Sequence, residues 1–193
     1  MIVEGWFDFA ERVPGAPNKV NGMNSPASGF IAHSAEGWED YLRSASANPG
    51  NSKSWHLSCL IDGRLLQHYP IDAQCWSSGH DQPNNNYVAM EAEGLYNTPL
   101  NARQTLTVVK VIRDLSAFKG WAPSRSGLHG FIKTLHEHNE WTATNCPSGR
   151  YNWPVIMTAL NEKPPPDSSV NIARLAHALP YLYAARYELH RER

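Results

Sequence analysis

The residues best suited to chemistry in this sequence lie between positions 138 and 147. His138 and Cys146 are eight residues apart in a polar stretch, and Pro147 follows at once. Imidazole and thiolate are the side-chain groups with the best affinity for a borderline-soft divalent ion such as zinc. Two such residues do not make a site, because a chain with nine His and three Cys produces some eight-residue spacings by chance.

A third candidate ligand, His33, follows the apolar residues 29–32, which predict a short core strand. His33 would then lie where the strand ends, at the rim of a sheet. Two imidazoles and one thiolate leave a fourth tetrahedral position for water, which is the arrangement of a catalytic zinc rather than a structural one. Such a centre keeps about one net positive charge, enough to acidify a bound water and to polarise a carbonyl.

Length and composition set the broad class of the protein. A chain of 193 residues with 41% hydrophobic and 18% charged residues is typical of one globular domain. The balance of 17 basic against 18 acidic residues gives no electrostatic footprint for nucleic acid. No apolar run approaches the roughly 20 residues of a membrane span. Cys59 and Cys75 could pair, although small buried hydrophobic residues are the simpler interpretation of both.

The first half of the chain predicts an entry segment, strands and a helix. Residues 1–28 are rich in Gly, Pro, Asn and Ser, which favours an extended segment laid over the domain. After the strand at 29–33, we expect a helix that Ser34 caps, with an apolar face formed by Trp38, Tyr41, Leu42 and Ala45. Residues 54–69 alternate with period two around Asp62-Gly63, which predicts a β-hairpin. A polar loop at 72–86 and a strand at 87–91 follow.

The second half predicts three helices. Asn101 and Gln104 resemble a capping box, and a buried stripe follows it at Val108, Val111, Ile112 and Leu115. Residues 151–160 predict another helix, in which Pro154 is tolerated only in the first turn. The Pro-rich residues 163–167 predict a stiff linker before a C-terminal helix. We therefore expect an α/β fold with a mixed sheet flanked by helices, divided into an N-terminal segment (1–28), a catalytic domain (29–162) and a linker with a helix (163–193).

Several segments also carry a family resemblance through their order and spacing. They are residues 31–37, 54–57 with 61–63, 67–70, 76–79, 86–94, 138–140 and 144–147. In these segments the chain resembles the zinc-dependent N-acetylmuramoyl-L-alanine amidases, the family of the phage lysozyme-type amidases and the animal peptidoglycan recognition proteins. The resemblance spans about residues 28–160.

The resemblance implies a role for each of five residues. His33, His138 and Cys146 match the zinc ligands of the family. Glu91 matches its acidic strand residue, a candidate general base, and Thr144 matches a position that helps to stabilise the tetrahedral intermediate. Amide hydrolysis needs an activated water, a polarised carbonyl and a proton shuttle to the leaving amine, so this set is chemically consistent.

The sequence departs from the family pattern at two places near the expected substrate. Trp55 stands where relatives commonly carry Tyr, and an indole N–H can donate a hydrogen bond but cannot act as a phenolic acid. Residues 76–79 lack the usual His of this loop, for which the nearby His80 could substitute. We expect Trp55, His56, Trp76 and His80 to contact substrate, with a core histidine as the alternative for His56.

Other polar and aromatic residues are open to two interpretations. Trp38, Trp76 and Tyr87 could form a rim that stacks on sugars, or they could pack in the core. Glu93 could be solvated or hydrogen-bonded within the fold. We expect His136 to face away from the metal and His129 to lie in a surface loop.

The implied activity is hydrolysis of the amide between N-acetylmuramic acid and L-alanine in peptidoglycan, by a monomer that binds neither nucleic acid nor membrane. Residues 1–6 lack the features of a signal peptide. We therefore expect a protein that acts on the bacterial cell wall and is either made in the cytoplasm and released by a holin or extracellular. A bacteriolytic and antimicrobial endolysin of the phage type fits this expectation. Two alternatives stay open: a non-catalytic peptidoglycan-binding module, which Trp55 suggests, and a zinc hydrolase of small anhydro-muropeptides.

Overall fold

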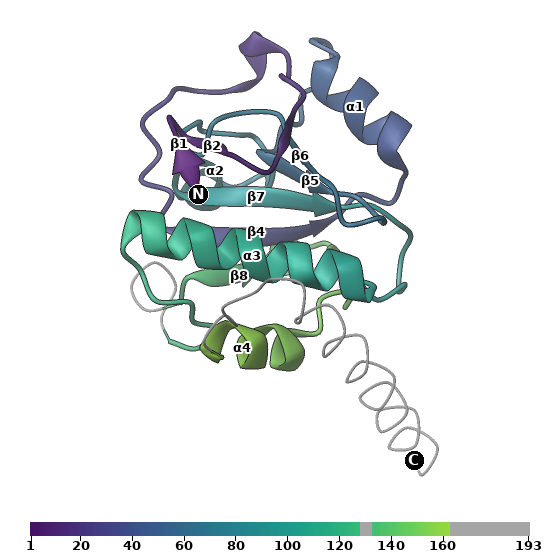
Figure 1. Ribbon diagram of the computed structural model, residues 1–193. Coiled ribbons are helices and arrows are strands. Elements are labelled where there is room, and N and C mark those ends of the chain that lie inside the picture. The colour runs from purple at the N-terminus through teal and green to yellow at the C-terminus, as the bar shows by residue number, and fades with distance from the viewer. Residues whose placement is uncertain (128–132, 163–193) are drawn as a thin grey trace.

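A six-stranded mixed sheet forms the centre of the protein (Figure 1). The computed structural model describes residues 1–127 and 133–162, so the predicted linker and helix at 163–193 and the position of His129 lie outside the described residues. The strands of the sheet follow the order β3-β6-β5-β7-β4-β8, and β1 and β2 form a separate antiparallel pair. Within the sheet, β5 and β6 are antiparallel and every other neighbouring pair is parallel.

The elements have the following bounds. The strands are β1 (Ile2–Val3), β2 (Trp6–Phe7), β3 (Glu11–Arg12), β4 (Gly29–Ser34), β5 (Leu57–Cys59), β6 (Leu65–Gln67), β7 (Tyr87–Ala92) and β8 (Leu135–Glu137). The α-helices are α1 (Glu39–Ala47), α2 (Asp81–Asn86), α3 (Ala102–Lys119) and α4 (Trp153–Asn161). Two 3₁₀ turns, η1 (Pro17–Lys19) and η2 (His138–Glu140), complete the described structure. The prediction of an α/β fold with a mixed sheet flanked by helices is confirmed.

The two central strands are buried on both faces, which explains their apolar sequences. Phe30, Ala32, Val88 and Met90 belong to the core cluster that includes the buried stripe of α3 and part of α4. The alternate residues of the same strands, such as Ile31 and Ala89, pack with Leu42 and Ala45 of α1. Each fully buried aliphatic side chain contributes roughly 1.5–3 kcal/mol. His33 and Glu91 fall on the α1 face because side chains alternate along a strand.

The predicted ends of α3 and α4 are confirmed. Asn101 accepts a hydrogen bond from the Gln104 backbone N–H, and the Gln104 side chain accepts one from the Asn101 N–H, so the capping box is complete. Gly120 ends α3 at a φ of 74°, a left-handed conformation that favours glycine. In α4, Pro154 lies in the first turn, where its missing N–H leaves no hydrogen bond unmade.

Three predictions of local structure are wrong. Ser34 does not cap α1, because it is the last residue of β4 and its hydroxyl donates to Glu36 instead. The predicted apolar face of α1 is only half buried, since Trp38 and Tyr41 are exposed. The polar segment 72–86 is not all loop, because it contains the short helix α2.

The N-terminal segment is tied into the domain rather than only laid over it. Its strand β3 pairs with β6 and forms one edge of the central sheet. Lys19 is fully buried, and its ammonium donates hydrogen bonds to the carbonyls of Ala45 and Ser46 at 2.7 and 3.2 Å. These carbonyls belong to the last turn of α1, where a positive charge is favourable.

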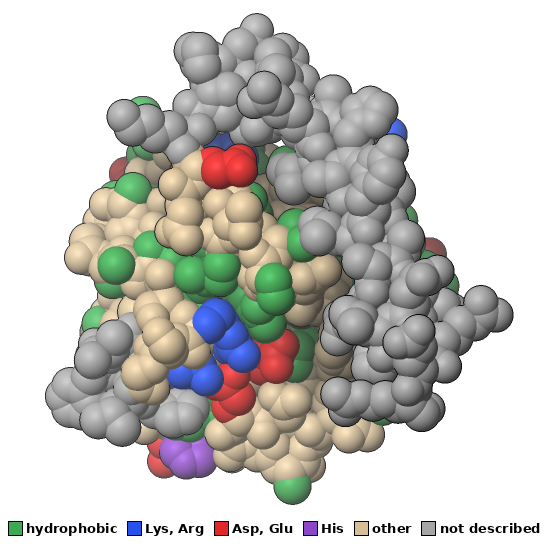
Figure 2. Space-filling view, turned by 90° about the horizontal axis from the view of Figure 1, so that it is seen from below, with side chains coloured by type: hydrophobic (Ala, Val, Ile, Leu, Met, Phe, Trp, Pro, Cys, Tyr) green, Lys and Arg blue, Asp and Glu red, His purple; other side chains and the backbone are tan. Residues whose placement is uncertain are grey.

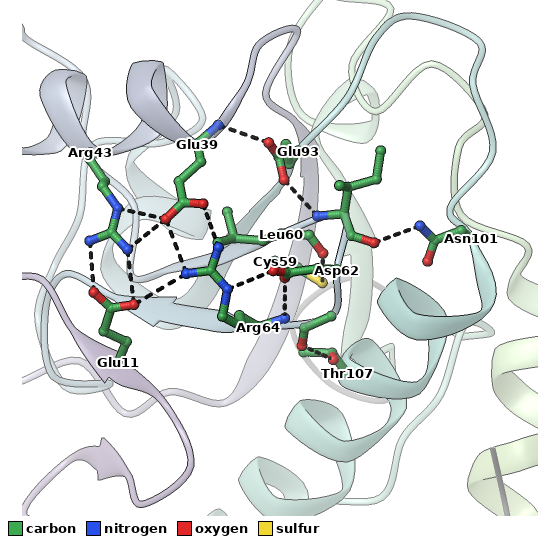
Figure 3. A network of polar contacts seen from close by, with 12 residues as sticks. Glu11, Glu39, Arg43, Cys59, Leu60, Asp62, Arg64, Glu93, Asn101 and Thr107 are labelled. Atoms are coloured by element: carbon green, nitrogen blue, oxygen red, sulfur yellow. Dashed lines mark hydrogen bonds and ion pairs between the residues drawn. The ribbon is translucent and has the colours of Figure 1, made fainter.

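A polar network joins this edge to α1 and to the β5–β6 hairpin (Figure 3). Arg43 binds Glu11 at 2.9 Å and Glu39 at 2.7 Å, and Arg64 binds Glu39 at 2.6 Å. The Glu93 carboxylate accepts hydrogen bonds from the backbone N–H groups of Glu39 and Ile61 at 2.9 and 2.6 Å. Glu93 is therefore hydrogen-bonded within the fold, which was one of the two interpretations of this residue.

A second group of ion pairs supports the turn that begins at His138. Glu140 binds Arg125 at 2.7 Å and Lys133 at 2.6 Å. Burial acts to raise the pKa of Glu140, but hydrogen bonds from His136 and Lys133 hold that pKa at about 2.

On the face seen from below, basic and acidic side chains gather beside hydrophobic ones (Figure 2). None of the described helices is long and apolar enough to cross a bilayer.

Candidate metal centre

The centre begins where β4 and β7 end side by side. The two strands are parallel, and their register pairs His33 with Glu91. Their arrows point to the same edge of the sheet (Figure 1). Because residues that are paired in a parallel ladder face the same side, both side chains project toward the α1 face. His33 is buried, and the Glu91 side chain is 16% exposed.

His138 and Cys146 reach the same place from the other side. β8 pairs with β4, and η2 follows β8 directly, which carries His138 to His33 with ring centroids 4.6 Å apart. The Asn139 N–H donates to the Cys146 carbonyl at 2.9 Å and closes the loop between the two candidate ligands. One ligand atom each of His33, His138 and Cys146 lies within 4.8 Å of the others.

The geometry of this group fits a tetrahedral metal ion. Cys146 Sγ lies 3.8 Å from His33 Nδ1. Zinc bonds of about 2.3 Å to sulfur and about 2.0 Å to nitrogen at a tetrahedral angle would separate these atoms by about 3.5 Å. His138 Nε2 donates to the Ser78 carbonyl at 3.2 Å, which leaves the lone pair on Nδ1. Among the described residues, neither His138 Nδ1 nor His33 Nε2 has a hydrogen-bond partner, although both atoms are buried.

The electrostatics of the group also suit a cation. Burial lowers the pKa of His33 well below its usual value, and it lowers that of His138, so both imidazoles stay neutral as metal ligands require. Burial raises the pKa of the Cys146 thiol to about 12, and the negative charge of Glu91 adds to this effect. The Ser34 N–H donates to Cys146 Sγ at 3.2 Å. A cation bound here would therefore displace the thiol proton, and its affinity would depend on pH.

Glu91 has the properties of a general base beside such a cation. Its Oε1 lies 4.0 Å from His33 Nδ1, and its Oε2 is buried without a hydrogen-bond partner among the described residues. Burial raises the pKa of Glu91 to about 7, against the opposing charges of Lys53 and Arg150. A carboxyl group with a pKa near the working pH can both accept and return a proton.

Comparison with known proteins agrees with this arrangement. The family model of N-acetylmuramoyl-L-alanine amidase matches residues 23–149, well over half of the chain and all of the candidate centre. The chain belongs to this family. Membership assigns it to amidases that act on peptidoglycan. A search of curated proteins finds no match.

Solved amidase structures share the fold. A selenomethionine derivative of AmpD has 18% sequence identity and a TM-score of 0.65, over 83% of this chain and 99% of that one. The catalytic domain of XlyA has 17% identity and a TM-score of 0.60, over 78% and 97%. The N-acetylmuramoyl-L-alanine amidase LysC from Clostridium intestinale has 17% identity and a TM-score of 0.57, over 79% and 99%.

Thr144, Trp76 and His80 have different settings in this amidase. Thr144 Oγ1 accepts the Cys146 N–H at 3.2 Å and so shapes the turn that presents the thiol. Trp76 is partly buried, and its backbone N–H donates to Ser54 at 2.7 Å. His80 is exposed, with its ring centroid 5.4 Å from that of Trp141. Because Trp141 directly follows η2, His80 lies close to the turn that carries His138.

Trp55 and His56 do not lie where a substrate could touch them. Trp55 is 3% exposed, and its Nε1 donates to Ser58 at 2.8 Å. His56 is fully buried, with Nε2 2.9 Å from the Ala73 carbonyl and Nδ1 accepting the Ala89 N–H at 3.0 Å. The expectation that both residues contact substrate is therefore wrong. His56 is a core histidine, which was the alternative. The exposure of these residues depends on what covers them, which alternation in the sequence does not reveal.

Of the expected aromatic rim, only part is at the surface. Tyr87 is 2% exposed and stacks on His136 with ring centroids 4.5 Å apart, so it packs in the core. His136 is buried outside the three-ligand group, as expected. Trp38 is 53% exposed.

The sequence reasoning missed Arg150 and Tyr151, which hold the centre in place. Arg150 is buried, and its guanidinium donates to Ser34 Oγ and to the carbonyls of Ala92, Glu93 and Thr98 at 2.6–3.0 Å. A Cβ at Gly94 would lie 2.5 Å from Arg150 Nη2, so only glycine fits there. The Tyr151 hydroxyl donates to the His33 carbonyl at 3.2 Å. No pattern in the sequence distinguishes this arginine from an exposed one.

Proposed function

We propose that this protein hydrolyses the amide bond between N-acetylmuramic acid and L-alanine in peptidoglycan with zinc as its cofactor. The observation that supports this most strongly is the convergence of His33, His138 and Cys146 beside Glu91. Two neutral imidazoles and a thiol suit zinc better than magnesium or calcium, which prefer oxygen ligands. Zinc, when bound, supplies a Lewis acid that polarises a carbonyl and lowers the pKa of a bound water.

Glu91 then moves the proton that hydrolysis must transfer. The Glu91 carboxylate, whose Oε1 lies 4.0 Å from His33 Nδ1, accepts the proton of the attacking water and returns a proton to the leaving amine of L-alanine. Without a bound cation, burial raises the pKa of this carboxyl to about 7, close to neutral pH. Thr144 is the proposed donor to the tetrahedral oxyanion, and the tie of its Oγ1 to the Cys146 N–H fixes it beside the ligand.

We also propose that the protein is a monomeric endolysin of the phage type, with bacteriolytic and antimicrobial activity. Several proteins of the same fold carry that name, including an endolysin from Bacillus subtilis and the Ph2119 endolysin of a Thermus scotoductus bacteriophage. Added from outside to walls that lack an outer membrane, the purified protein is expected to reduce their turbidity.

The non-catalytic alternative loses part of its motivation in the structure. It was suggested by Trp55, but this residue packs in the core cluster with Leu42 and Leu66, away from solvent. A module without catalysis would also have no need for a buried, unpartnered carboxyl group beside the ligands. Glu91 therefore favours an enzyme.

The decisive assay measures new free amino termini of L-alanine after metal-replete protein is incubated with purified peptidoglycan. We expect release, its loss with a chelator and its return with added zinc. Sedimentation with the wall without any turnover, with or without zinc, would support the binding module instead. Turnover confined to small soluble muropeptides would replace the wall polymer with a soluble fragment as the substrate.

A further inference from the structure

Four large side chains form an exposed surface beside the metal centre, named here the aromatic patch. Trp38 and Tyr41 come from the segment after β4, and Leu95 and Tyr96 come from the segment after β7. Their exposed fractions are 53, 48, 48 and 50%, respectively. Leaving so much apolar surface in water is unfavourable, and adjoining exposed apolar side chains commonly mark an interaction site.

The two segments are joined by backbone contacts, so the patch is one surface. Gly37 and Gly94 exchange two hydrogen bonds of 3.2 and 3.0 Å. Tyr41 packs directly against Gly37, where an added Cβ would lie 2.9 Å from its ring. The Tyr96 N–H donates to Glu36 Oε2 at 2.6 Å. These contacts fix the backbone that presents the rings, which lowers the entropy cost of binding.

A short series of contacts links the patch to the metal centre. The other oxygen of Glu36 accepts the Ser34 hydroxyl at 2.6 Å, and the Ser34 N–H donates to Cys146 Sγ at 3.2 Å. Arg150 also donates to Ser34 Oγ at 3.0 Å and to the Thr98 carbonyl at 2.8 Å, which anchors the segment after β7. A polymer cleaved at the centre would therefore extend over or close to the patch.

The charges around the patch indicate which part of such a polymer the patch can bind. Glu36 and Asp40 flank Trp38 along the chain and are exposed, so an anionic group would be repelled there. The stem peptide carries carboxylates, whereas the N-acetylated sugars of the uncleaved glycan strand are neutral, because the lactyl carboxyl of N-acetylmuramic acid is bound in the amide. Lys53, whose positive charge opposes the effect of burial on the pKa of Glu91, lies in a segment that Ser54 ties to the Trp76 N–H at 2.7 Å. Of the two basic groups whose charge acts on Glu91, Lys53 therefore lies in a different loop from the patch, and Arg150 is buried.

We propose that the aromatic patch binds the glycan strand of peptidoglycan, with Trp38 and Tyr96 stacking on the apolar faces of its N-acetylated sugars. Aromatic rings present a large rigid surface for such C–H faces, and the carboxylates of Glu36 and Asp40 can accept the sugar hydroxyl groups. This inference rests on the proposed function only for the placement of the scissile amide at the metal centre.

The test uses oligomers of β-1,4-linked N-acetylglucosamine, which keep the N-acetylated sugar faces but lack the free lactyl carboxylate of peptide-free N-acetylmuramic acid and are therefore neutral. Their binding to wild type, to W38A/Y96A and to the control F118A is measured by titration calorimetry, with thermal melting to confirm the fold. Phe118 is a matched control because it is 52% exposed but lies in the last turn of α3, on the opposite face of the sheet. We expect wild type and F118A to bind equally and W38A/Y96A to bind about tenfold more weakly.

Each other outcome overturns the proposal. Absence of any binding heat in wild type, equal affinity of W38A/Y96A and wild type, or an equal loss of affinity in F118A contradicts it. So does a dimer in wild type that W38A/Y96A abolishes in sedimentation, because a second copy of the chain would then cover the patch. Release of L-alanine termini, measured in parallel, reports on the proposed function separately, since glycan binding does not require turnover.

Discussion

At the scale of single residues, the Arg150 guanidinium and the Glu91 carboxyl differ in how far their surroundings satisfy them. The Arg150 guanidinium donates hydrogen bonds to four acceptors. Glu91 Oε2 has no hydrogen-bond partner among the described residues. A buried polar group that is fully hydrogen-bonded stabilises a fold, whereas an unpartnered one beside candidate ligands indicates chemistry.

Replacement of Glu91 by Gln should remove the proton shuttle and keep the metal. We expect kcat for L-alanine release to fall about 10²–10⁴-fold, the usual contribution of general acid–base catalysis. Zinc content should remain that of wild type, because Glu91 is not one of the three candidate ligands. The control E162Q changes an exposed carboxylate at the end of α4. Wild-type kcat in E91Q would contradict the role of Glu91.

Replacement of Arg150 by Lys should destabilise the protein although the charge is retained. An ammonium cannot reach acceptors on Ser34, Ala92, Glu93 and Thr98 together, so buried carbonyls lose their donors. We expect a loss of about 2–4 kcal/mol in the free energy of unfolding, measured by urea denaturation. The control R103K, at an exposed position of α3, should change it little. Equal stabilities of R150K and wild type would show that the guanidinium is replaceable.

The residue scale also shows what the sequence could predict about the site. The three candidate ligands were predicted from the order and spacing of several motifs together. His138 and Cys146 alone would not have been sufficient, because an eight-residue spacing of His and Cys can arise by chance. The structure brings His33 to them through the pairing of β4 with β8. Arg150 and Tyr151 could not be predicted, because their roles depend on strand ends that lie far away in the sequence.

At the scale of elements, hydrophobic patterning was sufficient for most helices and strands. The apolar strands β4 and β7, the hairpin at Asp62-Gly63 and the capped helix α3 all lie where the sequence predicts them. Ser34 and Trp38 show the limit of that reasoning. A serine before a helical pattern predicts a cap, but here the strand continues through Ser34, which pairs with Ala92 of β7.

The buried histidines His56 and His68 form hydrogen bonds through both ring nitrogens and should make the free energy of unfolding depend on pH. Burial lowers the pKa of His56 and that of His68 to about 4. Both rings accept a hydrogen bond through one nitrogen, the Ala89 N–H in one case and the Ser58 hydroxyl in the other, so protonation would break it. Since a folded pKa below the usual 6.5 favours the neutral form, the stabilisation is complete above pH 6.5 and is lost as the pH falls toward 4.

At about 1.4 kcal/mol per pKa unit, each histidine should contribute a loss of about 3 kcal/mol over this range. Urea denaturation between pH 7.5 and pH 4 should show the slope in wild type. H56Q should be less stable at neutral pH but lose less stability on acidification, whereas H80Q, at an exposed position, should retain the wild-type slope. An unchanged slope in H56Q would contradict the assignment.

At the scale of the whole molecule, the centre collects residues from both ends of the family match. His33 lies near its start and Cys146 near its end, and the sheet order places their elements next to each other. A metal ion at this point joins β4 to the loop after β8, a link that the unfolded chain lacks. Binding of zinc should therefore stabilise the fold as a whole.

Thermal melting should show this coupling directly. We expect Tm to rise when zinc is added to chelator-treated protein, with about 4 kcal/mol of stabilisation at a free zinc concentration 1,000 times its Kd. Magnesium should give no comparable rise, because two imidazoles and a thiolate suit it poorly. An equal rise with both ions would indicate nonspecific binding.

The most direct test of the whole account combines zinc analysis with the amidase assay for wild type, Cys146→Ala and Cys75→Ala. Cys75 is a matched control, since it is a buried free cysteine outside the three-ligand group. We predict stoichiometric zinc and release of L-alanine termini in wild type and in the Cys75 variant, and neither in the Cys146 variant. Full zinc occupancy and wild-type release in Cys146→Ala would contradict the proposed zinc amidase.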